Sequence, residues 1–155
     1  MKIYFKGKMS TFGGPHDFGV RPTEGLALVH AHNRHHYDEY FLGNQPVGTT
    51  GMARRLNPDK FYVACRWNYH ATPKQALSMI LVEVTNPANG KRAYAKPIDW
   101  GPDETTRRVA DLSPGLARHL GLDSDADPYL VASAKVLGSD VPFVWRSLPE
   151  SGGFP

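Results

Sequence analysis

Asp99 is the residue in this sequence that is best placed to do acid/base chemistry. It directly follows the strand expected over residues 92–98, and Trp100, Gly101 and Pro102 then force a turn. A carboxylate beside an indole in a partly apolar cleft is disfavoured in its charged form, so we expect a raised pKa for Asp99. Glycosidases keep their catalytic acid protonated near neutral pH in this way. The alternative is a carboxylate that only caps the turn by accepting hydrogen bonds from backbone N–H groups.

Glu24, Asp17 and Asp103 are the candidates for a second carboxylate. Lytic transglycosylation needs one group, which protonates the leaving glycosidic oxygen and then acts as base while the sugar's own 6-hydroxyl attacks. Hydrolysis with inversion needs a second carboxylate about 6.5–9.5 Å from the first. Glu24, which stands in a loop, joins Asp99 among the catalytic candidates, and a solvated loop acid is the alternative.

Asp111 precedes a helix that we expect to begin at Ser113-Pro114. Ser113 can accept hydrogen bonds from the first free N–H groups of that helix, and Pro114 has no N–H to satisfy. We interpret the Asp111 carboxylate as a partner of backbone N–H groups near the helix start, or of Arg108, rather than as a catalytic group.

Aromatic and basic side chains near Asp99 form the expected substrate-binding set, which is Trp100, Trp67, Tyr69 and Arg66. Aromatic faces stack on the C–H faces of sugars, so the three rings would line a glycan groove. The alternative for these rings is a place in the hydrophobic core.

Cys65 is the only cysteine, so an internal disulfide and a cysteine-based zinc site are both excluded. In an apolar strand we expect it to be a small buried hydrophobe. A nucleophilic pair of Cys65 with His70 is the alternative. His70 is the third catalytic candidate, beside Asp99 and Glu24.

Four of the seven histidines fall within residues 30–36. In helical spacing His32 and His36 share a face, as the members of metal-binding pairs do. The spacing of the tract fits no established metal motif, and such tracts are typical of hydrated surfaces. We therefore expect no metal and no cofactor.

Composition indicates one globular domain of 155 residues, with 41% hydrophobic and 21% charged residues. The 15 glycines and 13 prolines favour many turns and short strands. A formal charge of +3 permits an anionic partner without demanding one, and we expect no nucleic acid. No apolar run has the length of a membrane span.

The first residues lack the continuous apolar segment of a signal peptide. We therefore expect a protein that is cytoplasmic as synthesised. It would reach the periplasm or cell wall by another route, or be carried in a virion.

Local patterns predict a chain of short strands with two short helices. Strands are expected at residues 2–6, 9–12, 26–29, 61–67, 79–85, 92–98 and 128–132. The Asn-Gly step within residues 86–90 predicts an antiparallel hairpin. One helix should start at Thr72-Pro73 with Thr72 as N-cap, and the other should end at Gly121.

Three segments carry a resemblance to a known family. Residues 82–91 read V-E-V-T-N-P-A-N-G-K, residues 98–102 read I-D-W-G-P, and residues 108–113 read R-V-A-D-L-S. In spacing they resemble the rare lipoprotein A family, whose signature is approximately V-x-V-T-N-x-x-N-G-R, N-D-R-G-P and R-I-I-D-L-S. The likeness covers roughly residues 79–134.

That resemblance implies a six-stranded double-psi β-barrel, the fold that expansins and family 45 glycoside hydrolases share. It also implies cleavage of peptidoglycan glycan strands, as by lytic transglycosylases, with the D-R-G-P aspartate as acid/base. This aspartate matches Asp99. The chain departs from the pattern at Trp100, which replaces the arginine, and at Cys65, which aligns with the family's functional histidine, with His70 nearby but out of register.

The sequence thus favours a barrel domain over residues 1–138 with long N-terminal loops, and an irregular arm over residues 139–155. The leading function is glycan cleavage with Asp99 as acid/base. The alternative is a non-catalytic module that binds glycan or forms part of a larger assembly such as a phage tail. In that case the arm would mediate self-association or bind virion partners.

Overall fold

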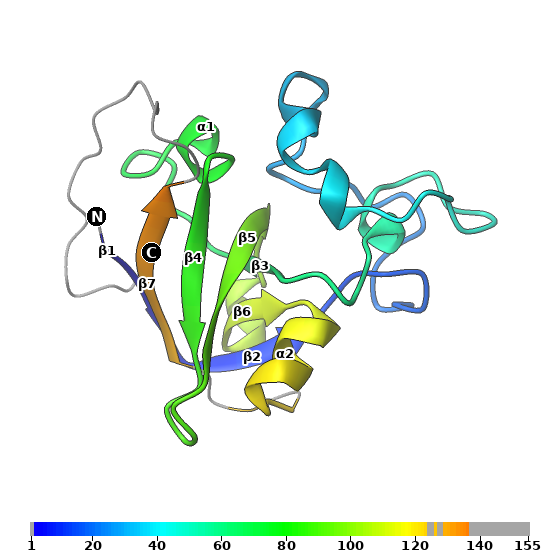
Figure 1. Cartoon of the computed structure of the whole chain (residues 1–155). Coiled ribbons are helices and arrows are strands. Elements are labelled where there is room, and N and C mark those ends of the chain that lie inside the picture. The colour runs from blue at the N-terminus through cyan, green and yellow to red at the C-terminus, as the bar shows by residue number, and fades with distance from the viewer. Residues whose placement is uncertain (1, 124–125, 127–128, 137–155) are drawn as a thin grey trace.

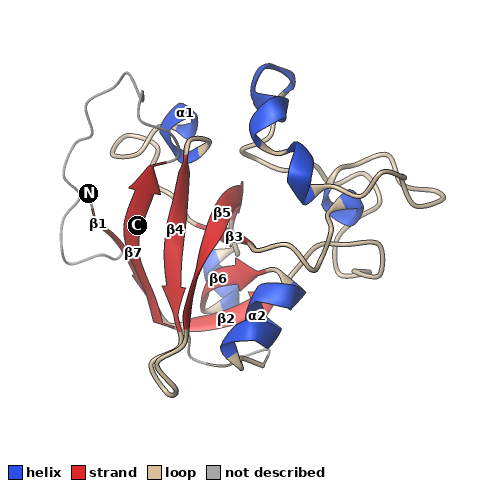
Figure 2. Ribbon diagram, viewed as in Figure 1, coloured by secondary structure: helices blue, strands red, loops and turns tan. Residues whose placement is uncertain are grey.

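The structure, a computed structural model, describes residues 2–123, 126 and 129–136 (Figure 1). Within them the chain is mainly β, as the sequence predicts, with two short α-helices and long loops (Figure 2). The arm expected over residues 139–155 lies outside the described residues.

Seven strands form the framework of the described residues. They are β1 (Lys2–Lys6), β2 (Lys8–Thr11), β3 (Tyr62–Cys65), β4 (Ile80–Thr85), β5 (Arg92–Trp100), β6 (Arg108–Leu112) and β7 (Tyr129–Val136). The helices are α1 (Lys74–Leu77) and α2 (Pro114–Leu120), and 3₁₀ turns occur at Ala31–His36, Asp38–Tyr40, Ala53–Arg55 and Glu104–Thr106.

The strands pair in the order β1-β7-β4-β5-β3-β6-β2. Pairing is antiparallel except between β3 and β5 and between β2 and β6, where it is parallel. This mixed sheet has seven strands, and its hydrogen-bonding order ends at β1 and β2 rather than closing on itself. The predicted six-stranded double-psi β-barrel is therefore confirmed only as far as a mainly β fold with a mixed sheet.

Gly7 alone joins β1 and β2, the two ends of that order. Its φ of +149° is one that side-chain-bearing residues rarely adopt, and a Cβ there would stand 2.9 Å from Cγ1 of Val109 on β6. A glycine at this position therefore lets the chain pass close to β6 between the two outermost strands.

The hairpin of β4 and β5 forms at the predicted Asn-Gly turn, and the two strands pair antiparallel. Two side chains of this turn reach a helix that lies far along the chain. Asn86 Nδ2 and Asn89 Nδ2 donate to the Leu120 carbonyl at the end of α2, over 2.8 and 2.9 Å. The hairpin thereby satisfies a carbonyl that the helix itself leaves free.

The two helix starts differ in how well they were predicted. Ser113 caps α2 as expected, since its Oγ accepts from Leu116 N over 3.2 Å, and Gly121 ends the helix with a φ of +69°. For α1 the predicted cap is wrong. Pro73 is the N-cap residue and makes no side-chain hydrogen bond, and Thr72 is buried with no hydrogen-bond partner for its hydroxyl.

Residues 13–60 form a long loop system that carries only short 3₁₀ turns, and it lies to the right of the strands in Figure 1. The strand predicted over residues 26–29 is wrong, because this segment is a turn against the end of β5. Leu28 N donates to the Ile98 carbonyl over 3.4 Å, and Val29 N donates to the Leu26 carbonyl over 3.2 Å. The apolar side chains of Leu26, Leu28 and Val29 are buried.

The side chain of Lys96 on β5 contacts the same loop system at Tyr37. Its side chain is fully buried, its Nζ donates to the Ser78 carbonyl, and it lies 4.9 Å from the centre of the Tyr37 ring. Burial lowers the pKa of Lys96 to about 8, and the nearby Glu39 opposes that shift. The loops are therefore packed on the sheet through buried polar as well as apolar contacts.

Candidate functional site

Asp99 and Asp111 stand on either side of one small residue, Ala64, at the centre of the sheet. β3 lies between β5 and β6, and Ala64 is the register partner of Asp99 on β5 and of Asp111 on β6. Register partners point to the same face of a sheet, so the two carboxylates share a face. Two strand spacings separate their backbones, about 10 Å.

A bulge creates this alignment. The pairing of β3 with β5 shifts between Val63, opposite Pro97, and Ala64, opposite Asp99, so that Ile98 is the extra residue. Bulges of this kind re-aim the side chains that follow them. Ile98 is fully buried, and Asp99 takes the place opposite Ala64.

The Asp99 carboxylate is held by two backbone donors. Its Oδ1 accepts from Ala27 N, in the turn packed on β5, and from Trp100 N, both over 2.8 Å. Burial raises the pKa of Asp99 to about 6, the two backbone hydrogen bonds oppose the rise, and the charge of Glu24 adds to it. The expectation of a raised pKa is confirmed, and so is the bonding of the carboxylate to turn N–H groups. The raised pKa and the hydrogen bonds to turn N–H groups therefore occur together.

Asp111 has the same kind of environment, which the sequence analysis did not anticipate. Burial raises its pKa to about 6, the charge of Arg108 opposes the rise, and the charges of Asp99 and Asp17 add to it. The charge of Arg108 thus acts on Asp111, and so does the charge of Asp99. Only its alignment with Asp99 across β3 distinguishes it from an ordinary helix-start acid.

Of the other candidate acids, Glu24 and Asp17 act on the pair of Asp99 and Asp111, and Asp103 lies on an exposed turn. Glu24 is close enough for its charge to raise the pKa of Asp99, and Asp17 does the same for Asp111. Asp103 instead caps an exposed turn, where its Oδ1 accepts from Thr105 N over 2.9 Å and its pKa is lowered. The structure thus brings Glu24 and Asp17 to the carboxylate pair.

The two tryptophans are linked to Asp99 but have different exposure. Trp67 Nε1 donates to the Asp99 carbonyl over 2.8 Å, and Trp100 Nε1 donates to the Trp67 carbonyl over 3.0 Å. Trp67 is buried and packs edge-on against Phe5, so it belongs to the core. Trp100 is 42% exposed, and as the register partner of Cys65 it points to the face of the strand opposite the Asp99 carboxylate.

Tyr69 and Arg66 occupy the surroundings of the pair. Burial and the charge of Asp99 raise the pKa of Tyr69 to about 12, and Lys74 Nζ lies 5.1 Å from its ring centre. Arg66 Nη1 donates to the carbonyls of Pro102 and Arg108, over 2.8 and 2.7 Å. Through these two hydrogen bonds, Arg66 stabilises the turn that follows Asp99.

His70 and Cys65 are in contrasting environments. His70 is exposed in the turn after β3, where its backbone N–H donates to Asn68 Oδ1 over 3.0 Å. Cys65 is fully buried, as expected, and burial raises the pKa of its thiol well above the ordinary value. Because side chains alternate along a strand, Cys65 points to the face opposite Ala64 and the carboxylates.

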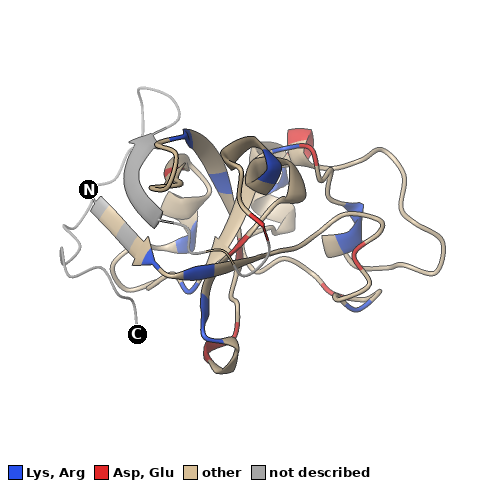
Figure 3. Cartoon of the chain, turned by 90° about the horizontal axis from the view of Figure 1, so that it is seen from below, with Lys and Arg blue, Asp and Glu red and all other residues tan. Residues whose placement is uncertain are grey.

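The histidine tract forms two ring pairs on the 3₁₀ turn Ala31–His36. His30 stacks on His32 with ring centres 5.5 Å apart, and the rings of His35 and His36 lie 4.0 Å apart. Within the described part of the chain, no group of three or more His, Cys, Asp or Glu side chains is arranged to hold a metal ion. Basic and acidic residues are interspersed over strands and loops (Figure 3).

Comparison with known proteins does not add to this geometry. No protein-family model matches the chain, and no curated protein matches it. None of the helices in the described residues combines the length and the apolar character needed to cross a membrane.

Proposed function

We propose that this protein cleaves the glycan strands of peptidoglycan, with Asp99 as general acid/base and Asp111 as the second carboxylate. The observation that carries the proposal is the pairing of both acids with Ala64, each with a pKa near 6. The charge of Asp99 raises the pKa of Asp111, so near neutral pH one carboxyl can be protonated while the other is charged. One is then an acid and the other a base.

In this proposal each part of glycosidic cleavage is assigned to a residue near the pair. Asp99, in its protonated form, donates to the leaving oxygen, and the exposed ring of Trp100, the next residue in the chain, offers a sugar-binding surface on the other face of the strand. Asp111, in its charged form, activates a water for inverting hydrolysis. With Asp99 alone, the sugar's own 6-hydroxyl takes the place of the water, as in a lytic transglycosylase. Glu24, Tyr69 and Arg66 surround the pair, and His70 is not needed for either route.

We further propose that the sheet is a double-psi β-barrel. Counting β1 and β2 as one strand bent at Gly7 reduces seven strands to six and unites the two ends of the pairing order. The two parallel pairings, β2 with β6 and β3 with β5, support this topology. So does the resemblance to the rare lipoprotein A family, because Asn86 and Asn89 of its N-x-x-N step both bind the end of α2.

A second function is favoured by Cys65. The family's functional histidine is replaced by a buried thiol that points away from the carboxylates and has a raised pKa, so it cannot take over that histidine's role. A barrel that keeps the exposed Trp100 ring but lacks this partner would bind glycan without cleaving it. It would then act as a targeting or structural module of a larger assembly, such as a phage tail or virion.

Digestion of purified sacculi distinguishes the two functions. Wild type should release muropeptides, and Asp99→Asn should reduce the rate by at least about 100-fold because the general acid is lost. Asp111→Asn should have a similar effect only for hydrolysis, so anhydro products from that variant indicate transglycosylation. Asp103→Asn, an exposed acid on the following turn, is the matched control and should retain activity.

The proposal of cleavage fails if wild type binds sacculi but releases nothing. That result would establish the binding module instead. Equal activity of wild type and Asp99→Asn would remove Asp99 from the mechanism.

A further inference from the structure

A pocket of about 360 Å³ opens beyond the end of β2, next to the carboxylate pair but separate from it. Ser10 on β2 is the register partner of Asp111, and the next two residues, Thr11 and Phe12, line the pocket. The pocket therefore begins one residue past the row that carries Asp99 and Asp111. Its volume is at the low end of ligand sites, which suits a single ring rather than a long chain.

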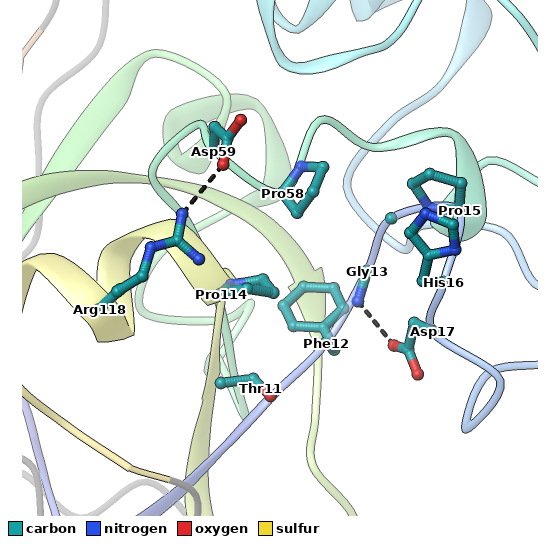
Figure 4. A pocket seen from close by; sticks show the side chains of 11 residues that line it. Thr11, Phe12, Gly13, Pro15, His16, Asp17, Pro58, Asp59, Pro114 and Arg118 are labelled. Atoms are coloured by element: carbon teal, nitrogen blue, oxygen red, sulfur yellow. Dashed lines mark hydrogen bonds and ion pairs between the residues drawn. The ribbon is translucent and has the colours of Figure 1, made fainter.

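The walls of the pocket are apolar in the middle and charged at the ends (Figure 4). Phe12, Pro58 and Pro114 lie between the two ends and present C–H surfaces. Asp17 lies at one end, and Arg118 of α2, bonded to Asp59 over 3.0 Å, lies at the other. A ligand with an apolar face and polar groups at its edges matches this arrangement.

Several backbone N–H groups along the pocket are missing or already bonded. Its prolines have no N–H, and the N–H groups of Gly13 and Gly14 are already bonded, to Asp17 Oδ2 over 2.7 Å and to the Ala53 carbonyl over 3.0 Å. Asp17 Oδ1 accepts from Gly19 N over 2.9 Å, so each carboxylate oxygen keeps one further lone pair for a ligand donor.

The charges of the pocket disfavour anions. Two carboxylates, Asp17 and Asp59, face a single guanidinium, Arg118, which is itself paired. A neutral ligand rich in O–H and N–H donors can give hydrogen bonds to the carboxylates and accept one from Arg118. Hydroxyl groups around a ring with C–H faces have this pattern.

We propose that this pocket is a binding subsite for one neutral sugar ring of the N-acetylhexosamine class, adjoining the carboxylate pair. The ring lies on Phe12, Pro58 and Pro114, gives hydroxyl protons to Asp17 and accepts from Arg118. The proposal rests on the proposed glycan substrate. It identifies the part of the chain that binds the next sugar beyond the cleaved bond.

The test is calorimetric titration with a soluble N-acetylglucosamine tetramer. Asp99→Asn serves as the parent protein, so that the probe is bound without being cut. Adding Arg118→Ala should weaken binding about tenfold, since a hydrogen bond to a charged group is lost. Adding Lys91→Ala, a change on the exposed β4–β5 turn, should leave the affinity unchanged.

Backbone amide NMR gives the second measurement. The Gly13 and Gly14 signals should move on titration, because both residues line the pocket. No binding, unmoved Gly13 and Gly14 signals, or equal affinity with and without Arg118→Ala overturns the proposed subsite.

Sacculus digestion by wild type separates this result from the proposed activity. Binding that depends on Arg118 without any digestion supports the subsite and rejects cleavage. Digestion with affinity that is indifferent to Arg118 supports cleavage and rejects the subsite.

Discussion

At the scale of a single residue, two opposing effects set the pKa of Asp99. Two backbone N–H groups favour its charged form, and burial together with the charge of Glu24 disfavours that form. Burial prevails, so the carboxyl retains a proton to a higher pH than a solvated aspartate does. A carboxylate that is buried in this way costs stability, and such groups are common at functional sites.

Asp99→Asn should therefore stabilise the protein, and more so at higher pH. The pKa of Asp99 is raised from 3.8 to about 6 in the folded state, so the folded state binds this proton more tightly than the unfolded state does. The contribution of this carboxyl to stability is fully present below pH 4 and is lost as pH rises through 6. Relative to wild type, Asp99→Asn should gain little at pH 4 and about 2–3 kcal/mol at pH 8. Urea unfolding at both values measures this.

Asp103→Asn is the control of opposite sign. The Thr105 N–H lowers the pKa of Asp103, so its charged form stabilises the fold above pH 4. This variant should lose stability relative to wild type as pH rises. A gain for Asp99→Asn that is the same at pH 4 and pH 8 would contradict the role assigned to its charge.

At the scale of elements, the turn between β4 and β5 works as a cap for α2. Asn86 is buried and uses both ends of its amide, because Nδ2 donates to the Leu120 carbonyl and Oδ1 accepts from Ala88 N over 3.0 Å. Asn89 reaches the same carbonyl from an exposed position. The N-x-x-N spacing therefore joins a hairpin to a helix as well as forming a turn.

Asn86→Ala should lower the free energy of unfolding by about 1–3 kcal/mol, because it leaves buried polar groups without partners. Asn89→Ala removes a bond to the same carbonyl where water can replace it, and should cost less than about 1 kcal/mol. Chemical denaturation of the two variants makes the comparison. Equal losses would show that burial of Asn86 is not what matters.

At the scale of the whole molecule, Gly7 determines how the two ends of the sheet meet. β1 pairs with β7 and β2 pairs with β6, and one residue separates them in the chain. That residue needs both a positive φ and the absence of a side chain, because Val109 stands against it. The link between the two outermost strands therefore depends on this glycine.

Gly7→Ala should lower the free energy of unfolding by about 2–4 kcal/mol, since backbone strain and overlap with Val109 act together. Gly90→Ala is the matched control, because Gly90 also has a positive φ, +73°, but has nothing within 4 Å of its would-be Cβ. It should cost only about 1–2 kcal/mol. Similar losses for both variants in thermal or urea unfolding would mean that the passage past Val109 is not tight.

Features set by neighbours in the chain were predictable. The Asn-Gly turn produced the hairpin, Ser113 and Gly121 bound α2, and Asp99 stands at the end of β5 with a raised pKa. The strand expected over residues 26–29 was wrong because its apolar content is equally suited to a buried turn, and only contact with β5 decides between them. The prediction that Thr72 caps α1 was wrong because the Thr72 side chain is buried.

Sequence by itself determined the class of fold, the short elements and the acid at the strand end, because these depend on interactions between residues a few positions apart. Tertiary structure alone decided that Asp111 is the partner of Asp99. That pairing requires β3 to lie between β5 and β6, and it requires the bulge at Ile98 to bring Asp99 opposite Ala64. A one-residue shift reverses the face to which a side chain points, and no local pattern in the sequence records that shift.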